Sequence, residues 1–491
     1  MLKTWRSEAS PVSMKFQLHL TLSILRMIIW CSSMASLQPV LNQVLKKIHP
    51  SEKESRDVGT FVSRLHHHAK KLGLDCVVCG SIGKFTWLAG DHDIDLFVFF
   101  PKNVEREELE KRGLDVGKKL TSEFGGKWKI KYAEHPYVHA MIKGFDVDIV
   151  PCYRIERGEH IKSAVDRSPL HLSYVLNNLK PEQYDEVRLL KQFCKGIGVY
   201  GADTKTQGFS GYICEILIMK YGSFEAALQH AEKWHAPHAI GEGDTRKFDA
   251  PFIVTDPTDA NRNAAAAISA ENFARFVFSA GQFLDRPSVE FFFPAAKKLG
   301  ASDMTKLKNR KTYFTAVVAP RPDVIDDVLW PQLRRARHRL VKELEQNEFK
   351  VIRSFEWASG DDEGGKGTIA LVFELEVWSL PPLQRMHGPP ITSHEHSARF
   401  LEKYGRPLFG PFVDGQGNWF IEKARSFERA DELLRTFLKR STKALEEAGI
   451  PNFVATAMKN HKLLTDAQFW QFAKSKGVSS LMWKKYMKKL Y

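Results

Sequence analysis

The most informative segment of the chain is Gly80-Ser-Ile-Gly-Lys-Phe-Thr-Trp-Leu-Ala-Gly-Asp-His-Asp-Ile-Asp-Leu96. It leads into residues 94–100, whose branched and aromatic side chains are typical of a buried strand. Asp93 and Asp95 lie two residues apart at the start of that strand, so their side chains share one face. Carboxylates against an apolar sheet are costly unless a cation neutralises them. The spacing therefore predicts a divalent metal site with oxygen ligands, for which Mg²⁺ is the preferred ion.

A third carboxylate, Asp148, interrupts another apolar strand in Val147-Asp-Ile-Val150. If the two strands are neighbours, the three acids converge and can hold two metal ions roughly 4 Å apart. Asp91 and Asp146 are alternative ligands that register alone leaves open. A single acid at a strand end is more simply explained as a cap or turn residue, but three acids within apolar strands favour the metal site.

Two features upstream of the acids suit phosphate oxygens. The pair Gly80-Ser81 is expected to form a turn with accessible backbone N–H groups and a hydroxyl, because glycine permits close backbone approach. Lys84 adds a positive charge three residues later. A Gly-Ser pair alone is a weak signal, but together with Asp-x-Asp at this spacing it is specific.

The rest of the chain predicts several successive domains. Helices at 36–73 and 103–124 and strands at 75–79, 94–100, 127–133 and 145–151 indicate a small α/β sheet. Helical periodicity dominates from about residue 181. From about residue 300 a β-α-β-β pattern follows, with a basic helix at 329–347, and it resembles a ferredoxin-like or RNA-recognition-type sheet. The aromatic signature of RNA-recognition domains is absent from this sequence.

The Gly-Ser turn followed by paired acids resembles the nucleotidyltransferase superfamily. Further motifs resemble the archaeal, class I CCA-adding enzymes, which are tRNA nucleotidyltransferases. These motifs are Thr86-Trp-Leu88, Ala133-Glu-His-Pro-Tyr-Val-His139, Asp148-Ile-Val-Pro-Cys-Tyr153, Ile161-Lys-Ser-Ala-Val-Asp-Arg167, Arg188-Leu-Leu-Lys191, Tyr200-Gly-Ala202 and Gly208-Phe-Ser-Gly-Tyr212. The resemblance runs from about residue 35 to the end and is loosest after residue 380.

The resemblance implies a set of site residues. The metal-binding and catalytic acids fall on Asp93, Asp95 and Asp148. The residues expected to bind ATP or CTP are Ser81, Lys84 (where the family usually has arginine), His171, Lys191 and Tyr200, and Arg262 matches an arginine that helps to select the base.

The resemblance also implies a fold and a division into domains. We expect an α+β multidomain chain with a palm-like α/β nucleotidyltransferase head, an all-α neck, a ferredoxin- or RRM-like body and a small α/β tail. The expected ranges are 34–180 for the head, 181–295 for the neck, 296–360 with 425–491 for the body, and 361–424 for the tail. The body and tail are expected to bind tRNA.

The implied activity is the template-independent addition of C, C and A to the 3′ end of tRNA. CTP and ATP would be the substrates, Mg²⁺ the cofactor and pyrophosphate the leaving product, and the enzyme would be a homodimer. Two alternatives remain open at this stage. One is a poly(A)-type polymerase, and the other is a non-catalytic RNA-binding protein on a transferase scaffold.

Composition agrees with an RNA partner. Among 491 residues, 72 Lys and Arg face 58 Asp and Glu, a net charge of +14 that favours a polyanion. Arg334 and Arg335, in the basic helix, are the residues expected to contact tRNA phosphates.

The cysteines and residues 1–33 give information about the cellular compartment of the protein. Six cysteines are too few for a disulfide scaffold, which favours a reducing, cytoplasmic compartment. The pair Cys76 and Cys79 is more simply part of a buried strand than a zinc or redox motif. Residues 1–33 carry an apolar run interrupted by Arg26, so we expect an extension upstream of Met34 rather than a membrane anchor.

Overall fold

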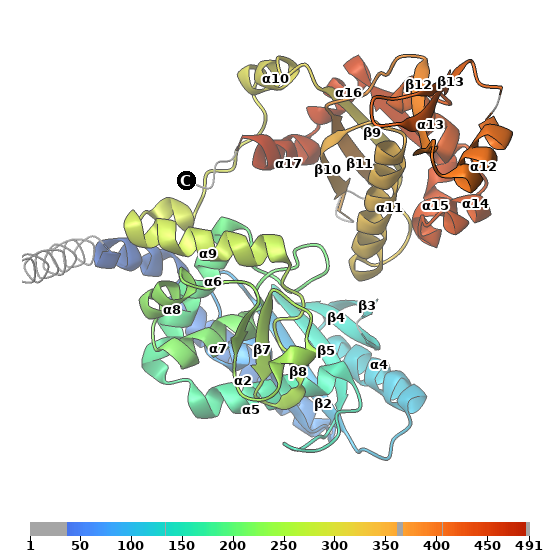
Figure 1. Cartoon of the computed structure of the whole chain (residues 1–491). Helices are drawn as coiled ribbons and strands as arrows, with labels where there is room; N and C mark the ends of the chain where they lie inside the picture. The colour runs from blue at the N-terminus through green and yellow to red at the C-terminus, as the bar shows by residue number, and fades with distance from the viewer. Residues whose placement is uncertain (1–36, 133, 361–366, 405, 488–491) are drawn as a thin grey trace, which may run out of the picture. The chain divides into compact units, whose positions relative to one another are not determined.

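The computed structural model describes residues 37–132, 134–360, 367–404 and 406–487. These residues form two compact units that divide after Ala295 (Figure 1). The predicted N-terminal extension lies outside the described residues, as do residues 361–366 at the start of the predicted tail. Within the described ranges, no helix is long and apolar enough to cross a membrane.

The first unit contains a five-stranded mixed sheet in the order β1-β2-β5-β4-β3. Strands β2 and β5 are parallel, and the other neighbours are antiparallel. The strands are β1 Cys76–Val78, β2 Asp93–Phe100, β3 Lys127–Tyr132, β4 Pro136–Ile142 and β5 Phe145–Tyr153. The sequence predicted all of these except β4, whose alternation is obscured by its proline and its mixed polar residues.

The two faces of this sheet differ in chemistry. Ile94 and Leu96 of β2 point into a core that is closed by helices α2 (Glu52–Lys71) and α4 (Arg106–Glu123). On the opposite face, Phe97 packs against Leu172 of helix α5 (Arg167–Asn178). Asp93 and Asp95 share the face of Phe97 because side chains alternate along a strand.

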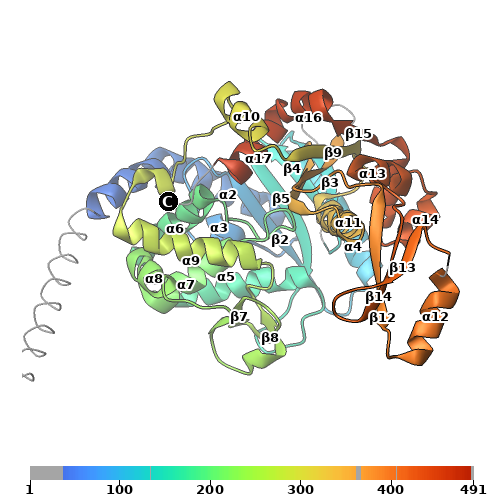
Figure 2. The same ribbon diagram turned by 45° about the horizontal axis from the view of Figure 1, so that its top comes forward.

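The next part of this unit, up to Ala295, is mainly a layer of helices (Figure 2), and aromatic side chains pack between them. Its main helices are α6 Tyr184–Ile197, α7 Gly211–Tyr221, α8 Phe224–Ala231 and α9 Ala270–Asp285. Phe193 lies within ring-contact distance of Phe224, Phe276 and Phe283, and all four are buried.

The helical periodicity predicted that this region is all-α, and that prediction is wrong. A three-stranded sheet is inserted between α8 and α9, in the order β6-β7-β8. Its strands are β6 His238–Ile240, β7 Phe252–Asp256 and β8 Asp259–Asn263. The Phe-Ile-Val-Thr sequence of β7 is typical of a buried strand. The residues before and after it in the sequence are polar and are typical of a loop.

The second unit confirms the predicted β-α-β-β pattern. Its sheet has the order β10-β11-β9-β15, built from β9 Tyr313–Pro320, α11 Asp326–Gln346, β10 Val351–Ala358, β11 Thr368–Leu375 and β15 Lys462–Thr465. Helices α11, α13 Ala430–Leu438 and α15 Asn452–Ala457 contribute to the core on one face. Helices α10 Ala301–Lys308, α16 Asp466–Ala473 and α17 Lys476–Tyr486 contribute to the core on the other.

A smaller sheet also belongs to the second unit. It has the order β12-β14-β13 and consists of β12 Leu383–Pro390, β13 Phe409–Val413 and β14 Asn418–Ala424, with helix α12 His394–Tyr404 between the first two strands. Helix α14 Thr442–Glu447 lies between α13 and α15 in sequence.

Candidate active site

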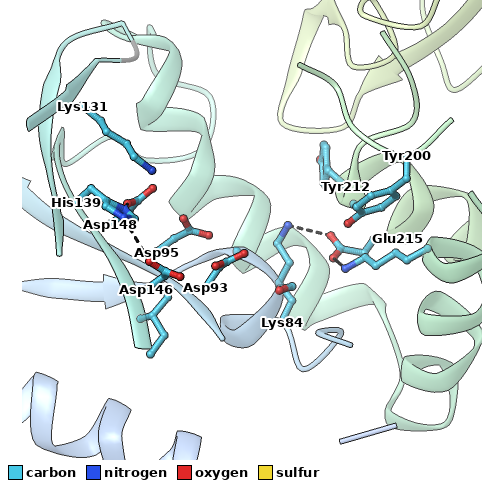
Figure 3. A pocket seen from close by; sticks show the side chains of 15 residues that line it. Lys84, Asp93, Asp95, Lys131, His139, Asp146, Asp148, Tyr200, Tyr212 and Glu215 are labelled. Carbon is cyan, nitrogen blue, oxygen red and sulfur yellow. Dashed lines mark hydrogen bonds and ion pairs between the residues drawn. The ribbon is translucent and has the colours of Figure 1, made fainter. Parts of the chain in front are cut away.

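Four carboxylates lie on one face of the first unit's sheet. In the parallel pairing of β2 with β5, Asp93 is beside Asp146 and Asp95 is beside Asp148. Directly paired residues point to the same face, so the three acids predicted as ligands line one pocket together with Asp146 (Figure 3). The structure therefore brings together carboxylates that are more than 50 residues apart in sequence.

These acids repel one another. Burial, together with the charges of Asp148 and Asp93, raises the pKa of Asp95 to about 6, against the opposing effect of Lys84. Burial and the charge of Asp146 also raise the pKa of Asp93. Crowded carboxylates of this kind are stabilised in their charged form by a bound cation.

A histidine bridges two of the acids. His139 Nδ1 lies 2.6 Å from Asp148 Oδ1, and its Nε2 lies 3.3 Å from Asp146 Oδ1. Strand pairing sets His139 directly beside Asp148, so the ring fixes the orientation of that carboxylate. Asp91, the other alternative ligand, instead accepts a hydrogen bond of 2.7 Å from Lys195 Nζ.

Gly80 lets the backbone approach the acids. Its φ is +63°, and a Cβ at this position would lie 2.0 Å from Asp95 Oδ2. The expected Gly-Ser turn is the start of a short helix, α3 Gly80–Gly83, and Ser81 lines the same pocket. Both the positive φ and the close carboxylate explain why glycine is needed here.

The donor set fits a divalent metal that is held partly by substrate. Among the described residues, no three His, Cys, Asp or Glu side chains are arranged to hold an ion on their own. Mg²⁺ is commonly bound by one or two carboxylates, with water and substrate phosphates completing its shell. Asp93, Asp95 and Asp148, with their mutual repulsion, fit that kind of site.

The opposite wall of the pocket contains two lysines that share a buried glutamate. Lys84 Nζ donates to Glu215 Oε2 at 2.8 Å, and Lys191 Nζ donates to Glu215 Oε1 at 3.1 Å. Lys191 also donates to the hydroxyl of Thr86 at 2.8 Å. The side chains of Lys191 and Glu215 are only 2% and 1% exposed. Two cations with one anion leave a net positive charge facing the acids.

Tyr200 and Tyr212 complete this wall. Both line the pocket, and a Cβ at Gly211 would be 3.2 Å from Tyr200 Oη and from Lys191 Cε. Burial raises the pKa of Tyr200 well above its usual value, so its hydroxyl stays protonated and can donate.

A buried aspartate joins the predicted His171 and Arg262. Asp256 Oδ2 lies 3.0 Å from His171 Nε2 and accepts a hydrogen bond of 2.7 Å from Arg262 Nη1. His171 also stacks on Tyr212, with ring centroids 3.8 Å apart. Burial alone would raise the pKa of Asp256, but hydrogen bonds from His171 and Thr258 hold it far below its usual range. The three groups form one hydrogen-bonded cluster next to the pocket.

The two arginines predicted to bind RNA differ in exposure. Arg334 NH1 lies 3.9 Å from Glu356 Oε1, and its side chain is 18% exposed. Arg335, one position further along α11, is exposed. Both belong to the second unit, whereas the acid site lies in the first.

Four residues to which the sequence had assigned no role complete the site. Lys131, His139, Glu215 and Asp256 line the pocket or hold its members in place, and of these His139 had appeared only as the end of a motif. Glu215 could have been found, because it is the one carboxylate in the apolar run of α7. Lys131 and His139 follow only from the pairing of β3 and β4, which the sequence does not show.

The groups on this face suit phosphoryl-transfer chemistry on a nucleotide. Carboxylates for a divalent metal stand across a pocket from a cationic wall with two tyrosines, on the sheet of a palm-like domain. This combination defines a nucleotidyltransferase. Three family models agree: a nucleotidyltransferase domain matches residues 60–171, the second domain of tRNA nucleotidyltransferase matches 185–293, and the C-terminal domain of CCA-adding enzymes matches 310–460.

Curated relatives identify the family within that class. The CCA-adding enzyme of Methanocaldococcus jannaschii is 40% identical over 76% of this chain and 85% of its own. Those of Methanothermobacter thermautotrophicus and Halobacterium salinarum are 39% and 41% identical, over 81% and 82% of this chain and 88% and 90% of theirs. The chain belongs to the CCA-adding enzyme family, as the sequence motifs predicted.

Proposed function

We propose that this chain completes the 3′ end of tRNA by adding C, C and A from CTP and ATP, without a nucleic-acid template. Each step joins a nucleotide to the terminal hydroxyl and releases pyrophosphate. The observation that carries the proposal is the in-register pairing of Asp95 with Asp148 opposite the lysine pair of Lys84 and Lys191. The family membership supports tRNA as the acceptor.

The metal in this proposal is Mg²⁺, held by Asp93, Asp95 and Asp148 with the triphosphate oxygens. Two bound Mg²⁺ ions would lower the pKa of the attacking hydroxyl and stabilise the charge on the triphosphate and the leaving pyrophosphate. Asp93 and Asp95, which share one face of β2, would hold the metal. Asp148, on the neighbouring strand and braced by His139, would serve the hydroxyl side.

The other residues bind and orient. Ser81, with the backbone of α3, would donate hydrogen bonds to phosphate oxygens beside Asp95. Lys84 and Lys191, held in place by Glu215, would attract the triphosphate, and Tyr200 would donate from its protonated hydroxyl. Phosphoryl transfer needs little covalent chemistry from the protein, so positioning and electrostatics account for most of the rate.

Base selection is assigned to the cluster around Asp256. Its carboxylate would hold Arg262 and His171 in a fixed geometry, because it bonds to both. A guanidinium with some donors committed to Asp256 presents its remaining N–H groups in one direction, which suits the acceptor edge of a base.

The proposal includes further partners. The second unit, through Arg334 and Arg335 on α11, would hold tRNA by its phosphates and its shape rather than by its sequence. We also propose a homodimer and a cytoplasmic location, the latter because the five described cysteines are all free thiols.

The test is incorporation of labelled nucleotide into tRNA that lacks its 3′-terminal C, C and A, with Mg²⁺ present. We expect labelled CTP to be added first and labelled ATP to be added only when CTP is also supplied. Asp95→Ala should abolish both additions while leaving tRNA binding intact, because it removes a carboxylate that would hold the metal.

Other outcomes would select the alternatives. Addition of ATP without CTP would indicate a poly(A)-type polymerase. Binding of tRNA without addition of either nucleotide would indicate a non-catalytic RNA-binding protein. Retention of a tenth or more of the activity by Asp95→Ala would remove the metal assignment.

A further inference from the structure

Three lysines border the acid face along its edge strand. Strand β3 lies at the edge of the sheet, and its residues Lys127, Lys129 and Lys131 alternate with Trp128 and Ile130. Pairing places Lys129 beside His139 of β4, which in turn is beside Asp148 of β5. Directly paired residues share a face, so all three lysines belong to the face that carries the acids.

Lys131 reaches into the pocket itself. It lines the same cavity as Asp148 and His139, and Figure 3 shows its side chain extending toward them from the side opposite Lys84 and Tyr200. Among the described residues it has no hydrogen-bonding or ionic partner, in contrast to Lys84 and Lys191. Its ammonium group is therefore not committed to a protein partner and is available to an anion that enters the pocket.

The order of the strands decides which anion that is. Across the sheet, β5 with Asp148 lies between β2 with Asp95 and the lysine strand β3. The triphosphate is assigned to the wall of Lys84 and Lys191, beyond β2. The acceptor hydroxyl served by Asp148 must therefore approach from the other side, with its own backbone over β4 and β3.

We propose that Lys131, with Lys129 behind it, binds the last internucleotide phosphates of the acceptor RNA and so places its 3′-hydroxyl at Asp148. This inference rests on the proposed function and adds an RNA subsite to it. Alternate lysines on a strand are roughly 6.7 Å apart along the chain, so two of them can follow a single strand of RNA backbone. Contact with phosphate gives affinity without regard to base, as required of a site that holds a changing 3′ end.

The simpler explanation is that these lysines only protect an edge strand from pairing with another chain, a common use of lysine at such positions. That explanation predicts no effect on RNA binding. A phosphate contact predicts a loss that depends on one particular phosphate of the RNA, so the two can be separated by changing the protein and the RNA together.

The experiment measures single-turnover addition of CTP to an acceptor RNA that ends before the first C. The half-saturating RNA concentration and the KM for CTP are compared for the wild type, Lys131→Ala, Lys131→Arg and the control Lys119→Ala. Lys119 is an exposed lysine on α4, which covers the opposite face of the sheet. Each protein is assayed on natural RNA and on RNA whose last internucleotide phosphate is replaced by an uncharged methylphosphonate.

We expect Lys131→Ala to raise the half-saturating RNA concentration about tenfold with an unchanged KM for CTP, the size of one charge-assisted contact. Lys131→Arg should recover most of the loss, and Lys119→Ala should have no effect. On the methylphosphonate RNA, the wild type should fall to the level of Lys131→Ala, which should fall no further.

Three results would overturn the assignment. They are an unchanged RNA requirement in Lys131→Ala, a raised KM for CTP instead, or losses from the protein and RNA changes that simply add. If the wild type adds no nucleotide at all, the proposed function fails, and binding of the two RNAs without nucleotide then decides the lysine subsite separately.

Discussion

Asp95 carries an electrostatic cost in the metal-free protein. Its raised pKa of about 6, caused by burial and by Asp148 and Asp93, means that the folded state favours the protonated carboxyl. The unfolded chain titrates near roughly 3.9. The cost is therefore absent below about pH 4, grows as the pH rises, and is complete above about pH 6.

Replacing Asp95 by asparagine should stabilise the metal-free protein while abolishing activity. In EDTA at pH 7, we expect Asp95→Asn to raise the melting temperature by about 2–4 °C for each kcal/mol relieved. The gain should shrink as the pH falls from 6 to 4, where the wild-type carboxyl becomes neutral. Thermal unfolding followed by calorimetry at a series of pH values measures this.

The matched control is Asp115→Asn, an exposed acid on α4. It should move the melting temperature little at any pH, because isolated surface substitutions have small effects. A melting temperature of Asp95→Asn at or below that of the wild type at pH 7 would show that the acids are not in repulsion.

The negative charge of Glu215 is needed to stabilise two buried lysines. Its carboxylate is the shared partner of Lys84 and Lys191, and those two charges hold its pKa below the usual range although burial opposes this. Glu215→Gln leaves two buried cations without an anion, so we expect a loss of about 3–5 kcal/mol in the free energy of unfolding. Urea denaturation provides the measurement.

A double variant tests whether the loss arises from charge. Lys84→Met combined with Glu215→Gln removes one member of each sign and should cost less than the sum of the single variants, with a coupling of about 0.5–3 kcal/mol. Additive losses would mean that Glu215 acts through packing alone.

Among the secondary-structure elements, helix α4 is held close to the sheet by its glycines. A Cβ at Gly113 would lie 2.4 Å from Pro151 Cγ, and Pro151 follows Asp148 on β5 by three residues. Gly113→Ala must push helix and strand apart, so we expect about 1–3 kcal/mol of destabilisation.

Gly59 on helix α2 is the matched comparison. It is exposed, and a Cβ there would have no atom within 4 Å. Gly59→Ala should stabilise the protein by about 0.5–1 kcal/mol, because alanine loses less entropy in a helix. Urea midpoints of the two variants should shift in opposite directions, and a destabilised Gly59→Ala would contradict this account.

The sequence was most informative for elements with a strong local pattern. The run of Ile94 to Phe100, with the acids at its start, predicted β2 and the face that carries the carboxylates. The β-α-β-β order of the second unit was also predicted correctly. It failed where an element is short or irregular, as in β4, which starts with a proline, and the β6-β7-β8 insertion.

The same limit applies to the site. The pairs that Lys84 and Lys191 form with Glu215 depend on packing between α3, α6 and α7, over separations of up to 131 residues. No local pattern reports such contacts. From the sequence and its family resemblance both lysines were expected to bind ATP or CTP, and the structure adds that they share one buried carboxylate.

On the scale of the whole molecule, the acid pocket and the basic helix α11 belong to different units. The acid pocket and the lysines that line it lie entirely within the first unit. The second unit contains the basic helix α11, whose arginines differ in what they contact. Arg337 donates to Glu356 and Ser354, and Arg339 donates to Glu343, so these two serve the fold itself.

Arg335 is the arginine of α11 best placed to bind tRNA phosphate, because it is exposed while Arg334 is mostly covered and lies near Glu356. We expect Arg335→Gln to weaken tRNA binding at low salt and to flatten the plot of log affinity against log salt by roughly 0.7–0.9 for one lost phosphate contact. The choice between CTP and ATP should not change. Arg334→Gln should instead lower thermal stability. Titrations of labelled tRNA at several salt concentrations, with Lys119→Ala as the surface-charge control, measure the slope, and an unaltered slope in Arg335→Gln would place the tRNA path on another face of the second unit.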